Sequence, residues 1–148
     1  MSGDDADQYM LGALLRIPFQ VIVERIHAGL RQAGFDDLSP AHLVVFQHMR
    51  PEGVRATELA ERAQITKQSM GYLIDHLEAR GYVARVADPS DKRARLVQLT
   101  ERGRMLDAAA RRIIAQVECE WSRYLGADRF AELKHLLREL IGALESHT

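Results

Sequence analysis

The sequence predicts a mainly helical, α+β fold. Three observations predict it: two short helical segments follow each other between residues 57 and 80, a β-hairpin pattern comes directly after them at residues 82–99, and long amphipathic helices lie at both ends of the chain. Two short helices followed by a hairpin make a winged helix-turn-helix with a two-stranded wing. The N- and C-terminal helices are predicted to form a dimerisation region.

The first helix is predicted over residues 9–33, where apolar residues recur every fourth position before Gly34 ends the pattern. Pro18 lies inside it. Because an interior proline removes a backbone hydrogen bond, we expect a kink near residues 14–18 or a helix that restarts there. A second helix is predicted from the cap and first-turn pair Ser39–Pro40 to Met49.

The helix-turn-helix is predicted from residue 57 to residue 80. Residues 57–63 have helical spacing, Gln64 and Ile65 make a short break, and Thr66 can cap a second helix that runs to about Arg80. In this motif the second helix enters a DNA major groove and the wing reaches the backbone or the minor groove.

The hairpin is predicted from a run of β-formers at residues 82–87 and a period of two at residues 95–99. Between them lie residues that favour a tight turn, Asp88, Pro89, Ser90 and Asp91. Thr100 then caps the next helix, with Glu101 in its first turn. The alternative is a solvated hairpin whose charges only keep the protein soluble.

At this point the chain resembles the MarR family of transcriptional regulators. The signature DxRxxxVxLTxxG of that family is matched at every defined position, by Asp91, Arg93, Val97, Leu99, Thr100 and Gly103. The segment LAERAQITKQSMGYLIDHLEARGYV, residues 59–83, is similar to the helix pair of the family. The resemblance extends from about Tyr9 to the C-terminus and is strongest between Leu59 and Gly103.

Two further helices are predicted after the wing. Their apolar stripes are Leu106, Ala110, Ile113, Val117, Trp121 and Tyr124, then Phe130, Leu133, Leu137, Leu140 and Leu144. Together with the first helix they carry more apolar surface than a short winged module can cover, which predicts a homodimer. The alternative is that these helices cover only their own module. The predicted parts are therefore residues 1–36 and 105–148 for dimerisation and residues 37–104 for DNA binding.

Composition and charge agree with a DNA-binding protein. A chain of 148 residues, 47% hydrophobic and 28% charged, is one domain or a compact pair of subdomains. The net charge is −1, but residues 50–104 carry 11 Lys and Arg against 8 Asp and Glu, so the positive excess lies in the winged segment. No apolar run reaches the about 18 residues of a membrane span, and the acidic residues 1–7 lack the basic start of a signal peptide. We expect a cytoplasmic, nucleoid-associated protein.

The predicted recognition helix has its core stripe on one side and polar residues on the other. Glutamine can pair with adenine, lysine can donate to guanine or phosphate, and hydroxyl groups can bind phosphate oxygens. Gly71 costs about 1 kcal/mol relative to alanine inside a helix, which suggests a close approach of its backbone to a partner. The DNA-binding candidates on this helix are Thr66, Lys67, Gln68, Ser69, Gly71 and Tyr72.

The wing tip supplies the other candidates, Asp91, Lys92, Arg93 and Arg95. A narrow minor groove concentrates negative potential, so the Arg93 guanidinium is the best candidate for insertion there. In the family that the chain resembles, the aspartate and the arginine of the signature play these roles, and Asp91 can pair with Arg93 to hold it extended. A purely structural pair is the alternative.

Catalytic and metal sites are not expected. His42 and His48 point about 120° apart on a helix, and the chain has no phosphate-binding glycine loop, nucleophile elbow or HExxH motif. We therefore predict no enzyme activity, no cofactor and no metal, although zinc assembled across a dimer stays an alternative.

The single cysteine, Cys119, excludes an intrachain disulfide. One branch of the family senses hydroperoxides through a cysteine near the N-terminus, and this chain has none there. Because Glu118 and Glu120 flank Cys119, its surroundings do not lower a thiol pKa, which favours a packing role.

The resemblance also implies a small, flat aromatic ligand, plausibly an acid, bound near the first, second and fifth helices. The matching segments contain Leu15, Pro18, Phe19 and Ile22, then His42, Phe46 and Gln47, then Met105 and Arg112. Apolar walls with a few polar anchors suit such a pocket, and His42 or Arg112 can hold a carboxylate. The alternative is that these residues belong to core or surface.

The predicted function is a homodimeric repressor that binds a pseudo-palindromic, double-stranded DNA operator and is released by a small ligand. The release step comes from the family resemblance alone. Alternatives are a repressor switched by oxidation of Cys119 and a winged-helix module used for protein contacts. Steep salt dependence of binding separates DNA binding from the last of these.

Overall fold

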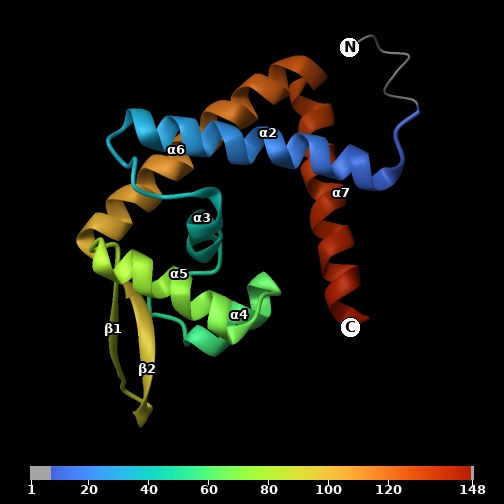
Figure 1. The fold of residues 1–148 in the computed structure, drawn as a ribbon. Coiled ribbons are helices and arrows are strands. Elements are labelled where there is room, and N and C mark those ends of the chain that lie inside the picture. The colour runs from blue at the N-terminus through green and yellow to red at the C-terminus, as the bar shows by residue number, and fades with distance from the viewer. Residues whose placement is uncertain (1–7, 148) are drawn as a thin grey trace. The chain divides into compact units, whose positions relative to one another are not determined.

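The computed structural model describes residues 8–147, which form six helices and one two-stranded antiparallel sheet (Figure 1). This confirms the mainly helical, α+β prediction, while the acidic segment 1–7 lies outside the described residues. No helix within residues 8–147 is long and apolar enough to cross a membrane. The chain divides within helix α6 into two compact units, Met1–Arg111 and Arg112–Thr148, which are described separately below.

Helix α2 (Leu11–Gln32) is continuous through Pro18, so of the two predicted alternatives, a kink or a restart of the helix, the restart is wrong. A proline ring can stay inside a helix when the surrounding turns hold it, at the cost of one backbone hydrogen bond. Near the end of α2, Leu30 is fully buried, and Gly34 follows with a positive φ of 95° that ends the helix. α2 contacts α3 within the first unit.

Helix α3 (Pro40–Gln47) begins at the predicted proline, with Ser39 at its N-cap. The backbone amide of Ser39 donates to Nδ1 of His42 at 2.9 Å, so the histidine takes the place of the usual glutamate of a capping box. The helix ends two residues before the predicted Met49.

Helices α4 (Ala56–Ala63) and α5 (Lys67–Ala79) form the predicted helix pair. Between them Gln64 adopts a left-handed conformation, with φ of 56°, which turns the chain sharply enough for the two helices to pack. Met70, Ile74 and Leu77 are fully buried on one side of α5, as the apolar stripe predicted. The other side of α5 is therefore left for solvent or a partner.

Strands β1 (Val83–Asp88) and β2 (Asp91–Leu99) form the predicted hairpin. It projects beyond the helices of the first unit as a narrow finger (Figure 1). The sequence did not indicate a third segment beside it: Val54 pairs with Val97 of β2 through two backbone hydrogen bonds of 2.8 and 3.0 Å. This pairing fixes the chain just before α4 to the half of the wing that is nearer its base.

Helix α6 (Glu101–Leu125) follows directly, and α7 (Ala127–Ser146) begins after Gly126. Thr100 caps α6 as predicted, because its hydroxyl accepts the amide of Gly103 at 3.1 Å and donates to the carbonyl of Gly81 at 2.5 Å. Thr100 thereby joins the base of the wing to the end of the recognition helix segment.

Candidate nucleic-acid interface

The exposed side of α5 carries the predicted recognition residues. The Thr66 hydroxyl accepts the Ser69 amide at 3.0 Å, so the first turn of α5 is capped. The Gln68 amide donates to the Tyr72 hydroxyl at 3.3 Å, and 66% of Tyr72 is exposed. The residues of this face that are classed as exposed are Thr66, Lys67, Gln68, Ser69 and Tyr72.

Gly71 lies on the same side of α5. A Cβ atom built at this position would meet nothing within 4 Å, so packing inside the described chain does not require a glycine here. Asp75, one turn later on the same side, binds Arg85 of β1 at 2.7 Å. Arg85 also binds Glu78 at 2.8 Å, so the start of the wing is tied to the second half of α5.

The wing turn is held by a buried carboxylate. Oδ1 of Asp88 accepts the backbone amide of Ser90 at 2.9 Å and its hydroxyl at 2.7 Å. Together with the Arg55 guanidinium, these donors lower the pKa of Asp88 to about 2. The carboxylate is therefore ionised at neutral pH and rigidly placed, although only 7% of the residue is exposed.

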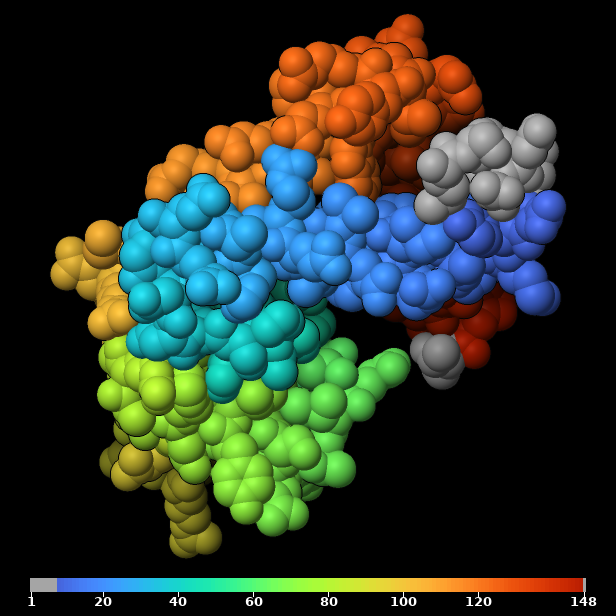
Figure 2. Space-filling view, turned by 45° about the horizontal axis from the view of Figure 1, so that its top comes forward, coloured from blue at the N-terminus to red at the C-terminus, as the bar shows by residue number. Residues whose placement is uncertain are grey.

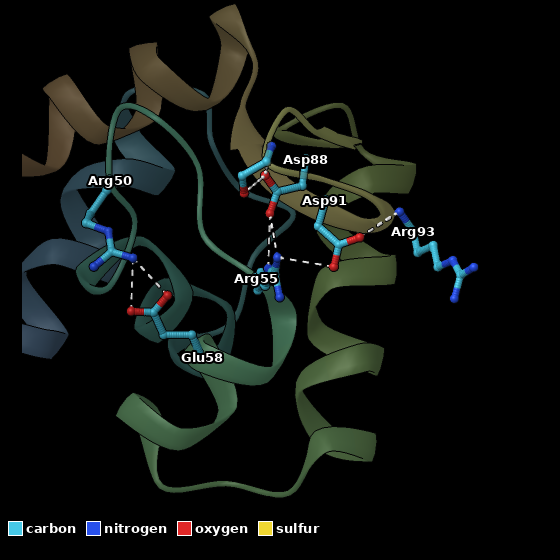
Figure 3. A network of polar contacts seen from close by, with 7 residues as sticks. Arg50, Arg55, Glu58, Asp88, Asp91 and Arg93 are labelled. Atoms are coloured by element: carbon cyan, nitrogen blue, oxygen red, sulfur yellow. Dashed lines mark hydrogen bonds and ion pairs between the residues drawn. The ribbon is translucent and has the colours of Figure 1, made fainter.

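Sequence reasoning missed Arg55. Its Nε and Nη2 donate to Oδ2 of Asp88 at 3.1 and 2.8 Å, and Nη2 lies 3.8 Å from Oδ2 of Asp91 (Figure 3). Arg55 is 33 residues before Asp88 in the chain, so no local spacing indicates the contact. Its one sequence signal is its place just before α4, beside the segment that pairs with β2.

Asp91 and Arg93 do not form the predicted side-chain pair. Oδ1 of Asp91 accepts the backbone amide of Arg93 at 3.1 Å, and its other oxygen faces Arg55. Two residues apart on a strand, the two side chains lean the same way but the shorter aspartate reaches only the backbone. Within residues 8–147 the Arg93 guanidinium has no ion-pair partner, and Figure 3 shows it extended away from the network. Lys92 and Arg95 are exposed as well.

The wing and α5 belong to one compact unit and lie next to each other (Figure 2). Contacts between α5 and β1 and between α4 and β2 join them. The unit therefore presents a helix with exposed hydrogen-bonding side chains and a finger with exposed cations, side by side. Such a pair of elements matches the two contacts that a winged helix makes with a duplex.

Comparison with known proteins agrees with this geometry. A model of the MarR family matches residues 36–94. The HTH-type transcriptional repressor Rv2887 of Mycobacterium tuberculosis is 30% identical over 135 residues, which cover 91% of this chain and 96% of that protein. The chain belongs to the MarR family. The sequence resemblance is thereby confirmed, and so is the prediction of a regulator rather than an enzyme, since this family consists of transcriptional regulators.

Solved structures of MarR-family proteins superpose on most of the chain. The crystal structure of Rv2887 in complex with salicylic acid has a TM-score of 0.67 and 31% identity, covering 91% of this chain and 98% of that one. The transcriptional repressor CouR, bound to a 23-mer DNA duplex, has a TM-score of 0.71 and 27% identity, covering 94% and 96%. The winged-helix fold is therefore that of the family.

The residues that the MarR-family resemblance implies as ligand contacts differ in burial. Phe46 is a core residue whose ring packs edge-on against Tyr82, whereas Leu15, Phe19 and Met105 are about half exposed. Pro18 and Gln47 are exposed, Ile22 is partly buried, and Arg112 belongs to the second unit. A hollow on the first unit is lined by other residues, Ala28, Arg31, Gln32 and Asp36.

His42 is engaged on both sides. Its Nδ1 accepts the Ser39 amide, and its ring stacks on His76 with 3.8 Å between the ring centres. Burial lowers the pKa of His42, and the neighbouring His76 and Arg80 lower it further. The ring is therefore neutral at pH 7 and offers a carboxylate only the proton on Nε2. No group of three or more metal-ligating residues occurs within residues 8–147.

Both terminal regions carry exposed apolar side chains. On α2 these are Leu11, Leu14, Leu15, Phe19 and Val21, and on α7 they are Leu133, Leu136, Leu137, Leu140, Ile141 and Leu144. The exposed fractions range from 36% to 68%, which is high for leucine, isoleucine and phenylalanine on helices of this length.

Cys119 is exposed in the single chain, which differs from the packing role that its neighbours in the sequence suggested.

Proposed function

We propose that this protein is a homodimeric repressor that binds a pseudo-palindromic operator. The observation that carries the proposal is the placement of the exposed side of α5 beside a wing whose Arg93 is extended and without an ion-pair partner within residues 8–147. The relatives support it, since Rv2887 is named a transcriptional repressor and CouR is a repressor bound to a DNA duplex.

In this proposal, α5 enters the major groove and Arg93 enters the adjacent minor groove. Lys67 and Gln68 meet base edges, and the hydroxyl groups of Thr66, Ser69 and Tyr72 bind phosphate oxygens. Lys92 and Arg95 add phosphate contacts beside Arg93, and Asp91 holds the backbone of the tip.

The apolar faces of the terminal helices support the dimer. A face of leucines that a chain of this size leaves exposed is usually covered by a partner, and a two-fold axis presents the same face twice. Residues 1–36 and 105–148 then form the dimerisation region and residues 37–104 the DNA-binding domain. Two recognition helices related by this axis address half-sites about one DNA turn, ~34 Å, apart.

DNA binding is tested with duplexes selected by the full-length protein from fragments of its source genome. Fluorescence anisotropy at several salt concentrations should give a pseudo-palindromic site and an affinity that falls steeply with salt. Arg93→Ala should keep the fold and the dimer but lose about 1 to 3 kcal/mol of operator binding, since the side chain makes no core contact. The exposed Arg31→Ala on α2 is the matched control. Binding that selects no DNA sequence and whose affinity does not change with salt would refute the proposal.

Release by a small aromatic acid is the second part of the proposal. The salicylic acid complex of Rv2887 supports it, as do the half-exposed apolar residues of α2. A ligand shifts the equilibrium only by its differential affinity, so it must bind the free protein more tightly than the DNA complex. Titrating salicylate and larger aromatic acids with and without operator measures both affinities. Equal affinities would remove the release step and leave oxidation of Cys119 as the competing switch.

A further inference from the structure

Two separate connections join the wing to the start of α4. The first is the backbone pairing of Val54 with Val97, which lies two residues before the end of β2, nearer the base of the hairpin than its tip. The second is the Arg55 side chain, which reaches the far end of the hairpin at Asp88 and Asp91 (Figure 3). One connection alone would leave the finger able to pivot, whereas two at different heights fix its angle to α4.

The second connection continues to the wing tip. Arg55 lies between two carboxylates, and Asp91 uses its remaining oxygen to accept the Arg93 amide at 3.1 Å. Asp88 is held in turn by the amide and hydroxyl of Ser90. A path of one ion pair, Arg55 to Asp91, and one hydrogen bond, Asp91 to the Arg93 amide, thus runs from the N-cap of α4 to the backbone of the residue whose guanidinium points outward.

The chemistry of Arg55 suits this role better than direct contact with DNA. The planar guanidinium donates two hydrogen bonds to one oxygen of Asp88 and faces a second carboxylate, so its charge is already matched by two negative groups. Its pKa is raised by the hydrogen bond to Asp88. An arginine in such a pair loses much of its attraction for a phosphate, and Arg93, without an ion-pair partner in the described part of the chain, keeps it.

We propose that Arg55 is a positioning residue for DNA binding, which sets the angle of the wing and the direction of Arg93 through Asp88 and Asp91. This inference rests on the proposed function. α4 packs on α5, so Arg55 also fixes the wing relative to the recognition helix. The Val54–Val97 pairing and the Arg85 ion pairs hold the base of the wing, and Arg55 holds its far end, where Arg93 lies.

A double-mutant cycle tests the role. Operator affinity is measured by anisotropy for the full-length wild type, Arg55→Ala, Arg93→Ala and the double variant. Arg55→Ala should bind on the order of tenfold more weakly, and the double variant should bind no more than about twofold more weakly than Arg93→Ala alone, because the effects of residues that belong to one polar network are not additive. Fold losses that multiply would show that Arg55 acts on DNA independently of Arg93 and would overturn the proposal.

The control is Arg62→Ala. Arg62 lies in α4, the helix that Arg55 precedes, its side chain is 47% exposed against 45% for Arg55, and it pairs with Glu58 rather than with the wing. Its loss removes the same charge and should leave operator affinity within about twofold, as expected for a surface pair. Affinity of Arg55→Ala equal to that of wild type, or a loss in Arg62→Ala as large as in Arg55→Ala, would also refute the positioning role.

A second variant and a second readout separate positioning from folding. Asp91→Asn keeps an oxygen for the Arg93 amide but removes the charge that faces Arg55, and it should weaken binding in the same direction as Arg55→Ala. Hydroxyl-radical footprinting should show that protection of the minor groove is lost in both variants. Methylation protection of guanine N7, which reports the major-groove contact of α5, should be retained. Loss of both protections together, or retention of both, would overturn the inference.

The failure of this inference can be distinguished from the failure of the proposed function. A wild type that selects no operator would refute the proposed function itself. A wild type with normal affinity, a weakened Arg93→Ala and an Arg55→Ala of normal affinity would refute only the positioning role.

Discussion

Gly103 lies so close to the backbone of Tyr82 that a methyl group at this position would overlap the Tyr82 carbonyl oxygen. This contact brings the first turn of α6 against the start of the wing, where Tyr82 is fully buried. The Tyr82 carbonyl also accepts the Thr100 amide at 3.1 Å, so moving it away would strain a second hydrogen bond. The glycine that ends the family signature is therefore required by a close approach of two backbones.

Gly103→Ala should lower the free energy of unfolding by about 1 to 3 kcal/mol, because the atom in the way is rigid backbone. Urea denaturation followed by circular dichroism measures it. Gly142→Ala is the control, since a Cβ there meets nothing within 4 Å and the helix should gain stability. A Gly103→Ala protein as stable as the wild type would show that the wing base moves freely.

Gly71→Ala should have opposite effects on stability and on DNA binding. A Cβ at Gly71 has open space around it, so the free protein should gain about 1 kcal/mol from the higher helix propensity of alanine. If α5 lies in the major groove, the added methyl group instead obstructs the approach of the helix backbone to the duplex. Urea titration and operator anisotropy on the same variant measure the two effects. Unchanged affinity in a stabilised protein would remove Gly71 from the interface.

The sequence predicted what depends on local pattern. The stripe of Met70, Ile74 and Leu77 identifies its own buried side, because residues three and four apart share a face of any helix. Thr100 could be placed as a cap because it stands directly before a helical segment, where a hydroxyl accepts an amide of the first turn. The family resemblance then extended these local features to a whole winged helix.

Contacts between distant segments were beyond the sequence. Arg55 and Asp88 are 33 residues apart, and Tyr82 donates to Asp37, 45 residues earlier, at 2.6 Å. An exposed arginine pairs with whichever carboxylate the fold brings near, so its partner is fixed only after the strands and helices are packed. The predicted pair of Asp91 and Arg93 failed for this reason: Arg55, supplied by another segment, lies beside the free oxygen of Asp91.

The acid stability of the protein should reflect Asp88. Its hydrogen bonds from Ser90 and Arg55 lower its folded-state pKa to about 2 from 3.8, so the unfolded chain binds the proton first as the pH falls. The stabilisation is therefore fully present above about pH 4 and is lost as the pH falls toward 2. Urea unfolding between pH 5 and pH 2 should show a weaker pH dependence for Asp88→Asn than for the wild type. Identical slopes would mean that the carboxylate is not held as the hydrogen bonds indicate.

The apolar face of α7 should control assembly. Leu140 and Leu144 are 46% and 57% exposed in the single chain, and burying the exposed part of each against a partner contributes about 1 kcal/mol, roughly half of the value for a fully exposed leucine. Leu140→Glu combined with Leu144→Glu places two carboxylates in that interface. Light scattering should then show a monomer, circular dichroism should show that it is still helical, and anisotropy should show weakened operator binding. Arg138→Glu is the control, because residue 138 lies two positions from residue 140 and so on the opposite side of the helix. A doubly substituted protein that stays dimeric would place the interface elsewhere, and a monomeric wild type that binds a full palindrome with high affinity would refute the dimer.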